Sequence, residues 1–264
     1  MLTRVSSLKM LKAKLLWSFL PFLLILPSIS FAQSSYTGHN WYFGNGPYGI
    51  RFSRSDGSAT LVSNHAALGT GGGAVASDAT NGDLLFYTDG VNIYDRTNTV
   101  MPNGSGLVGN AAGNQAVAIA KVPGQDNQYY VFTNSANGAT PGSISYRIVD
   151  MSLGGNAVFP APPAGEGTTA GNTAVTGLAS TSEAMLIVPQ PNSDNFWLIT
   201  HVNGSASYNV TLFTPTGPTT TTTFAGAGLI EHAANFSYYP GTSGGNGRIA
   251  VSPQEATRDV EIFD

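Results

Sequence analysis

Residues 74–104 read AVASDATNGDLLFYTDGVNIYDRTNTVMPNG, and the rest of the chain repeats their pattern. They contain two dipeptides typical of tight turns, Asn81-Gly82 and Asp89-Gly90. Both dipeptides accept the positive φ angles that a two-residue hairpin turn requires. The stretch therefore predicts a three-stranded antiparallel meander whose leading strand is Ala74–Asp78.

Counting outward from Asp89-Gly90 predicts which residues of the second hairpin face each other. Phe86 lies opposite Ile93 in this register, and Leu85 lies opposite Tyr94 on the other face. Large apolar side chains thus project from both faces. A sheet with one wet face would carry polar residues at alternate positions, so this pattern indicates a sheet covered on both sides.

The same meander recurs three times later in the chain. The units span approximately residues 74–104, 116–150, 184–214 and 235–264. A hydroxyl side chain ends the second strand of each unit, at Thr88, Thr133, Thr200 and Ser252. These hydroxyls are about 45 to 67 residues apart, which suits propeller blades of roughly 40 to 50 residues with loop insertions.

A single meander of this kind cannot bury both of its faces, so the units must stack around an axis. We therefore predict an all-β fold, a β-propeller-like stack of about four antiparallel meander blades that form an incomplete ring. The four hydroxyls should then occupy equivalent positions on successive, separate sheets. The alternative is an ordinary antiparallel sandwich whose strands resemble one another by chance.

Residues 1–32 have the pattern of a signal peptide. Its positive region contains Arg4, Lys9, Lys12 and Lys14. The apolar segment Leu15–Leu26 is too short to span a bilayer comfortably, and Ser30-Phe31-Ala32 is a small-x-small cleavage signal. We predict cleavage after Ala32, a fold within residues 33–264, no membrane span after cleavage, and a secreted or outer cell-surface location. The alternative is an uncleaved anchor helix.

Removal of residues 1–32 makes the chain more acidic. Four of the eleven basic residues and none of the fifteen acidic ones lie there, so the net charge changes from −4 to −8. Only one lysine, Lys121, remains. Without a basic stripe, electrostatics argue against binding to nucleic acid or to anionic membranes. The chain has no cysteine, and its length allows it to bury a core without disulfides.

An aromatic segment at residues 40–52, NWYFGNGPYGIRF, precedes the first unit without a partner strand of its own. The last blade of a closed propeller is often completed from the other terminus, so residues 40–52 are a candidate closing strand. Together with residues 77–104, this segment resembles the N-terminal propeller-like region of large secreted Bacteroidetes proteins. Ser145–Met151 and Phe196–His201 are similar to further strands of that family.

The resemblance covers residues 40–264 and implies a location more than an activity. Proteins of that family commonly end in a gliding-motility-associated, type IX secretion sorting domain, and they offer no established catalytic residues to transfer. This sequence ends at Asp264, inside the fourth unit. We expect a fragment of a larger secreted protein that continues into further blades or a C-terminal sorting domain. Residues 152–183 and Thr219–Thr223 depart from the family pattern and are expected to be surface loops or small edge strands.

The four histidines, His39, His65, His201 and His232, lack the spacing of a zinc site. His201 ends a buried-type strand and is a weak candidate for a general base; the alternative is a strand-end histidine with satisfied hydrogen bonds. Glu231 could orient His232 as a base, but no activated-serine motif accompanies this pair.

Four carboxylates fall within the first meander, Asp78, Asp83, Asp89 and Asp95. Calcium prefers several oxygen ligands, so these residues are weak candidates for a calcium site, although no EF-hand loop is present. The alternative assigns Asp89 to turn chemistry and places Asp83 and Asp95 beside strands. A pair of glycosidase carboxylates also stays open, because the spacing it requires is spatial.

Two functions fit the sequence. The first is a non-catalytic surface module for binding or display, whose rigid loops contact a glycan or a protein. The second is a propeller enzyme, such as a hydrolase, a lyase or a quinoprotein-like dehydrogenase, with an axial active site. Fold alone does not decide between them. The scarcity of Lys, Arg and His after residue 32 favours the first.

Overall fold

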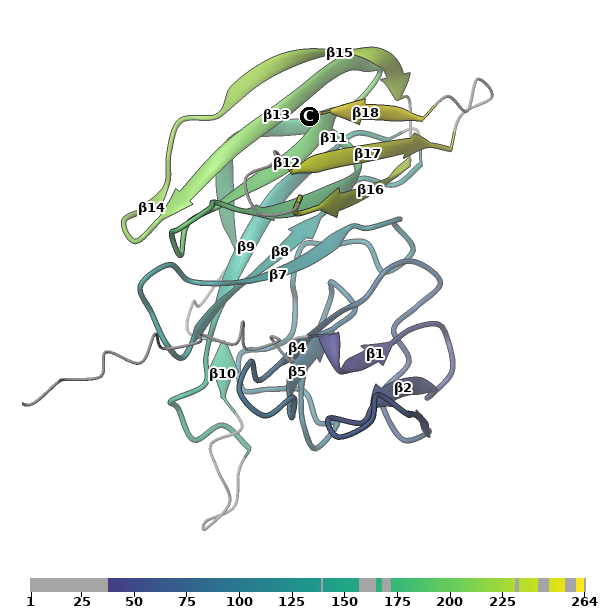
Figure 1. Cartoon of the computed structure of the whole chain (residues 1–264), viewed down its shortest axis with the longest axis vertical. Coiled ribbons are helices and arrows are strands. Elements are labelled where there is room, and N and C mark those ends of the chain that lie inside the picture. Colours follow the sequence, from purple (N-terminus) through teal and green to yellow (C-terminus); the bar gives the residue numbers. More distant parts are fainter. Residues whose placement is uncertain are drawn as a thin grey trace, which may run out of the picture. The chain divides into compact units, whose positions relative to one another are not determined.

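The computed structural model describes residues 38–138, 140–156, 165–167, 172–230, 233–241, 247–254 and 260–263. The predicted signal peptide and the candidate pair Glu231 and His232 therefore lie outside the described residues. The described part is all-β and contains no α-helix (Figure 1). Its strands form four antiparallel sheets, none of which closes on itself.

Three of the sheets have three strands each. The first contains β1 (Asn40–Tyr42), β2 (Gly49–Phe52) and β3 (Ala59–Val62). The second contains β4 (Ala74–Ser77), β5 (Leu84–Thr88) and β6 (Ile93–Asp95). The last contains β16 (Ala234–Tyr239), β17 (Arg248–Pro253) and β18 (Glu261–Phe263).

The remaining sheet has nine strands. Its first part is β7 (Val117–Lys121), β8 (Gln128–Asn134), β9 (Gly142–Asp150) and β10 (Glu166–Gly167). Its second part is β11 (Thr173–Pro189), β12 (Phe196–Val202), β13 (Ser205–Thr214), β14 (Gly217–Pro218) and β15 (Thr222–Ile230). Consecutive strands pair as β4–β5–β6, β7–β8–β9, β11–β12–β13 and β16–β17–β18, at the four places where the sequence predicts a meander.

The long strand β11 joins two of the predicted meanders, β7–β9 and β11–β13, into one sheet. Its N-terminal part pairs with β9, as in Thr173 opposite Tyr146, and its C-terminal part pairs with β12, as in Met185 opposite Thr200. Register shifts accompany the change of partner, and Ser180 has a φ of 63° there. Thr133 and Thr200 therefore share a sheet, contrary to the expectation of four separate sheets. Residues 152–183 are expected to be surface loops or small edge strands, but their last part, from Thr173, belongs to β11, which lies between β9 and β12 in the sheet.

The register of the β5–β6 hairpin differs from the predicted one. Phe86 pairs with Asp95 and not with Ile93, because the connection is a four-residue loop, residues 89–92. The Asp89 carboxylate accepts hydrogen bonds from the backbone N–H groups of Val91 (2.8 Å) and Asn92 (2.6 Å). A side chain that satisfies loop backbone in this way stabilises a wider turn than the two-residue one.

The aromatic segment at residues 40–52 forms β1 and β2 of the first sheet and does not pair with β16–β18. Its missing partner is β3, which pairs with β2 so that Ile50 lies opposite Leu61. The sequence predicts no strand at Ala59–Val62, because the short ATLV run carries no clear strand pattern, and in the structure it is mostly exposed. Among the described residues, the segment therefore belongs to a sheet of its own and is not paired as a closing strand of the last sheet.

Both faces of β5 are buried, as the sequence pattern predicts. Tyr87 packs with Tyr42 of β1 in a core between the first and second sheets. Phe86 packs with Val131 of β8 in a core between the second sheet and β7–β9. Phe86 and Tyr87 are both 0% exposed. The second sheet is thus covered on its two sides by different neighbours (Figure 1).

Two more cores continue this series. Phe132 of β8 packs with Leu198 of β12 in the core between β7–β9 and β11–β13. On the other face of β12, Ile199 packs with Phe236 of β16 in the core between β11–β13 and β16–β18. The leading strands also contact one another in order, β1 with β4, β4 with β7, β7 with β11, and β11 with β16. The meanders therefore stack in sequence order.

Candidate functional site

A polar cavity of about 610 Å³ lies beside the loops that follow the leading strands. The first sheet and the β4–β5 loop form much of its wall, and the β6–β9 region supplies the rest. The lining residues are Asn40, Tyr42, Arg51, Val62, Asn64, Asp78, Asn81, Asp83, Leu84, Leu85, Arg96, Asn98, Asn127 and Met151. Two of the four predicted carboxylates, Asp78 and Asp83, are thus brought to one site.

The β4–β5 loop is held by its own side chains. The Asp78 carboxylate accepts hydrogen bonds from the backbone N–H groups of Thr80 (2.8 Å) and Asn81 (2.9 Å). The Asn81 side-chain oxygen accepts one from the backbone N–H of Asp83 (2.8 Å). From β1, the buried Asn40 amide donates to the Gly82 carbonyl (2.9 Å). These bonds fix the loop against the first sheet before any ligand is bound.

The charges of the cavity balance formally, with Arg51 and Arg96 against Asp78 and Asp83. Arg51 Nη2 donates to Asp83 Oδ1 at 2.9 Å. Both side chains are about half exposed or more, so this ion pair contributes little stability. Its groups instead remain accessible to a ligand in the cavity.

Two further amides supply unused hydrogen-bonding capacity. The exposed side chains of Asn64 and Asn127 line the cavity and make no hydrogen bond to another described residue. An amide side chain offers two N–H donors and an acceptor oxygen. Tyr42 adds a ring stacked on His65, with ring centroids 4.4 Å apart, and burial raises the pKa of its phenol. The cavity can therefore donate to and accept from an uncharged polar ligand.

The other two predicted carboxylates lie elsewhere. Asp89 is bound to its own loop, and Asp95 Oδ1 accepts hydrogen bonds from the backbone N–H (2.7 Å) and the hydroxyl (2.6 Å) of Thr97. The described residues contain no group of three His, Cys, Asp or Glu side chains that could hold a metal ion. The four carboxylates of the β4–β6 meander thus do not lie at one site, and the calcium site stays a prediction.

His201 is buried in β12, away from the cavity. Its ring meets Tyr208 edge-on, with ring centroids 4.8 Å apart, and neither ring nitrogen has a hydrogen-bond partner among the described residues. Burial lowers the pKa of His201 to about 4, and the Glu261 carboxylate opposes this shift. The expectation of satisfied hydrogen bonds is thus not met, and the fully buried ring is not among the residues that line the polar cavity.

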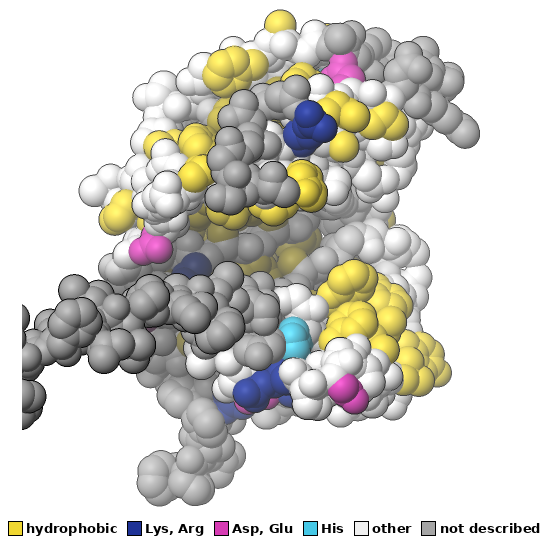
Figure 2. Space-filling model, in the orientation of Figure 1, with side chains coloured by type: hydrophobic (Ala, Val, Ile, Leu, Met, Phe, Trp, Pro, Cys, Tyr) yellow, Lys and Arg dark blue, Asp and Glu magenta, His cyan; other side chains and the backbone are white. Residues whose placement is uncertain are grey.

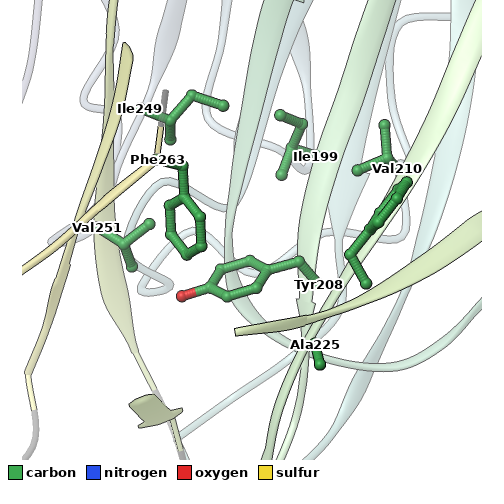
Figure 3. A pocket seen from close by; sticks show the side chains of 8 residues that line it. Ile199, Tyr208, Val210, Ala225, Ile249, Val251 and Phe263 are labelled. Carbon is green, nitrogen blue, oxygen red and sulfur yellow. The ribbon is translucent and has the colours of Figure 1, made fainter. Parts of the chain in front are cut away.

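A second cavity, of about 320 Å³, is apolar and lies between the third meander and β16–β18. Figure 3 shows the side chains that line it, which are Ile199, Tyr208, Val210, Phe224, Ala225, Ile249, Val251 and Phe263. Its one hydroxyl, that of Tyr208, already donates to Glu261 Oε2 at 2.7 Å. This cavity therefore has few groups that could orient a polar ligand, and it is less suited to recognition than the polar one.

Sequence reasoning missed Arg51, Arg96, Asn64 and Asn127. They come from separate segments, and the stacking of the second sheet on both the first sheet and β7–β9 brings them together. No local motif could have found them, because surface arginine and asparagine residues in loops have no distinctive spacing. In the part of the chain that the structure describes, no helix is long and apolar enough to cross a membrane. No known family model, curated protein or solved structure matches this chain.

Proposed function

We propose that this protein is a non-catalytic extracellular binding module, and that its polar cavity binds a neutral oligosaccharide. The observation that carries the proposal is the lining of that cavity, in which amides and charge-balanced groups from separate segments converge. Its volume of about 610 Å³ is within the range of small-molecule sites, roughly 300 to 1,000 Å³.

The chemistry of the lining favours a polyhydroxylated ligand. A sugar hydroxyl both donates and accepts hydrogen bonds, as do the Asn64 and Asn127 amides. The balance of two arginines and two aspartates gives no net attraction for a charged ligand. A pre-formed site loses less conformational entropy when a ligand binds. The hydrogen bonds of Asp78 and Asn40 hold this site in place before binding.

The proposal includes the architecture and location that the sequence suggests. We propose that the stacked meanders are blades of an incomplete propeller, which is supported by their packing in sequence order and by the serial contacts of their leading strands. Export through the signal at residues 1–32 and kinship with the secreted Bacteroidetes proteins rest on the sequence pattern alone.

The test is a screen of the purified chain against an array of soluble neutral oligosaccharides, followed by calorimetry on any that bind. Asn64→Ala and Asn127→Ala should each weaken binding at least about tenfold, which corresponds to roughly 1.4 kcal/mol and suits the loss of a hydrogen bond to ligand. Neither change should shift the melting temperature, since neither side chain bonds another described residue.

Asn45→Ala is the matched control, because Asn45 is an exposed loop asparagine of the same sheet outside the cavity lining. Its affinity should equal that of the unchanged protein. Absence of binding to every neutral oligosaccharide, or equal weakening by all three changes, would remove the proposal.

A further inference from the structure

Exposed large hydrophobic side chains gather on the outer face of the first sheet. On this face Trp41 pairs with Ile50, and Ile50 pairs with Leu61, so one apolar row crosses all three strands. Trp41 is 55% exposed and Leu61 is 68% exposed. Phe43 and Tyr48, exposed just beyond β1 and β2, extend the row. We call these five residues the first free face.

The last sheet also has an exposed face at the other end of the series, and on it Arg248 lies opposite Tyr239. Ile262, which is 66% exposed, pairs with Ala250 of β17. Tyr239 and Val260 are also exposed, at alternate positions that share this side of the sheet. We call these four hydrophobic residues the second free face. Figure 2 shows hydrophobic side chains over β1 and β2, and others over β17 and β18.

Both end sheets are covered on their other side. Tyr42 of β1 lies in the core shared with the second sheet, and Val251 of β17 lies in the core shared with β11–β13. Each of the four cores lies between two three-stranded units that follow each other in chain order, although β7–β9 and β11–β13 belong to one sheet. Among the described residues, no sheet packs against the first free face or against the second.

The composition of the first free face suits another protein surface. Its five residues include no Lys, Arg, Asp or Glu, so covering them would bury no unpaired charge. Trp41, Phe43, Tyr48 and Leu61 together expose on the order of 500 Å² of apolar surface, given 150 to 250 Å² for a whole aromatic side chain. That is a large patch for a monomer, yet less than the roughly 800 Å² per partner of a stable complex.

We propose that the first free face of one molecule docks on the second free face of another copy. This contact repeats, between two molecules, the face-to-face packing that joins each three-stranded unit to the next one within the chain. Such a contact is heterologous, because two different surfaces meet, and it produces either a closed ring or a growing series. The small area gives a weak, concentration-dependent association.

The test uses two variants, Leu61→Asp and Ile262→Asp, each of which places a charge on one free face. Sedimentation velocity of the unchanged full chain should show association that grows with concentration. Each variant alone should remain monomeric, because one of its two docking surfaces is blocked. An equimolar mixture should form a one-to-one heterodimer that grows no further, because each variant retains the surface that the other needs.

The mixture also reports folding, since two misfolded chains would not form a discrete complex. Thr60→Asp is the matched control, because Thr60 lies beside Leu61 on β3, is exposed, and points to the opposite face. It should associate like the unchanged chain. Residues 15–26 are the same in all variants, so association through that apolar segment would not respond to these changes.

Three outcomes would overturn the proposal. A monomeric unchanged chain at high concentration would show that the free faces do not dock. Dimers of Ile262→Asp alone would show that the first free face pairs with itself. A mixture that stays monomeric would show that the two free faces are not complementary.

Discussion

The first two sheets, β1–β3 and β4–β6, are both three-stranded antiparallel meanders, but they differ in what covers them. In the second sheet the neighbours Phe86 and Tyr87 are both fully buried, each in a different core. In the first, Tyr42 is buried while its neighbour Trp41 is mostly exposed. Apolar side chains on both faces therefore indicate that a sheet can be covered on both sides. The position of the sheet in the stack decides whether a neighbouring sheet covers each face.

The largest expected effect is at a covered face. Phe86→Ala should lower the free energy of unfolding by about 3 to 5 kcal/mol, because it leaves a cavity in the core between the second sheet and β7–β9. Urea titration at neutral pH measures the change. A loss below about 1 kcal/mol would mean that this core is not packed as described.

A smaller effect, with a pH signature, is expected at His201 on a covered face of β12. The unfolded histidine binds its proton near pH 6.5, whereas burial lowers the folded pKa to about 4. Stability is therefore fully present above pH 6.5 and should fall by about 3 kcal/mol as the pH approaches 4, because the unfolded state binds the proton first. The measurement is urea titration across this range.

His201→Phe is the control for that prediction, since it keeps a ring in the core and removes the titration. The carboxylates still titrate in both proteins, so the relevant quantity is the difference between the two pH profiles. Identical profiles between pH 6.5 and 4 would contradict a buried, neutral His201.

The smallest effect is expected at the first free face. Trp41→Ser should change the free energy of unfolding by about 1 kcal/mol in dilute protein, because the half-exposed side chain loses only a hydrogen bond to the Gly38 carbonyl and an edge contact with Phe52. The same titration as for Phe86→Ala provides the comparison. A loss as large as that of Phe86→Ala would show that the first free face is covered even in the monomer.

The sequence predicts the strands well where turn chemistry and apolar runs coincide. The four meanders stand where Asn81-Gly82, Asp89-Gly90 and the aromatic runs place them. The register predicted for β5–β6 is wrong, because the Asp89 side chain stabilises a four-residue loop, which the Asp-Gly dipeptide does not reveal. The sequence predicts no strand at β3, because its four residues are mostly exposed and carry no alternation of apolar and polar side chains.

The candidate site was less predictable than the fold. Asp78 and Asp83 are two of the four carboxylates that the sequence offers as weak calcium candidates, and the structure places both at the polar cavity beside arginine and amide side chains. Arg51 reaches Asp83 from a segment 32 positions earlier, and this contact depends on the stacking of two sheets. Residue spacing along the chain carries no information about such a contact until the packing of the sheets is known.

The shared strand β11 has a consequence for how the molecule opens. Its 17 residues pair with β9 at one end and with β12 at the other, so backbone hydrogen bonds tie the second and third meanders together. The second sheet is attached to its neighbours by side-chain packing and loops. Amide protons of β8 and β12 should therefore exchange with solvent in one cooperative step, while those of β5 exchange through a separate, lower-energy opening.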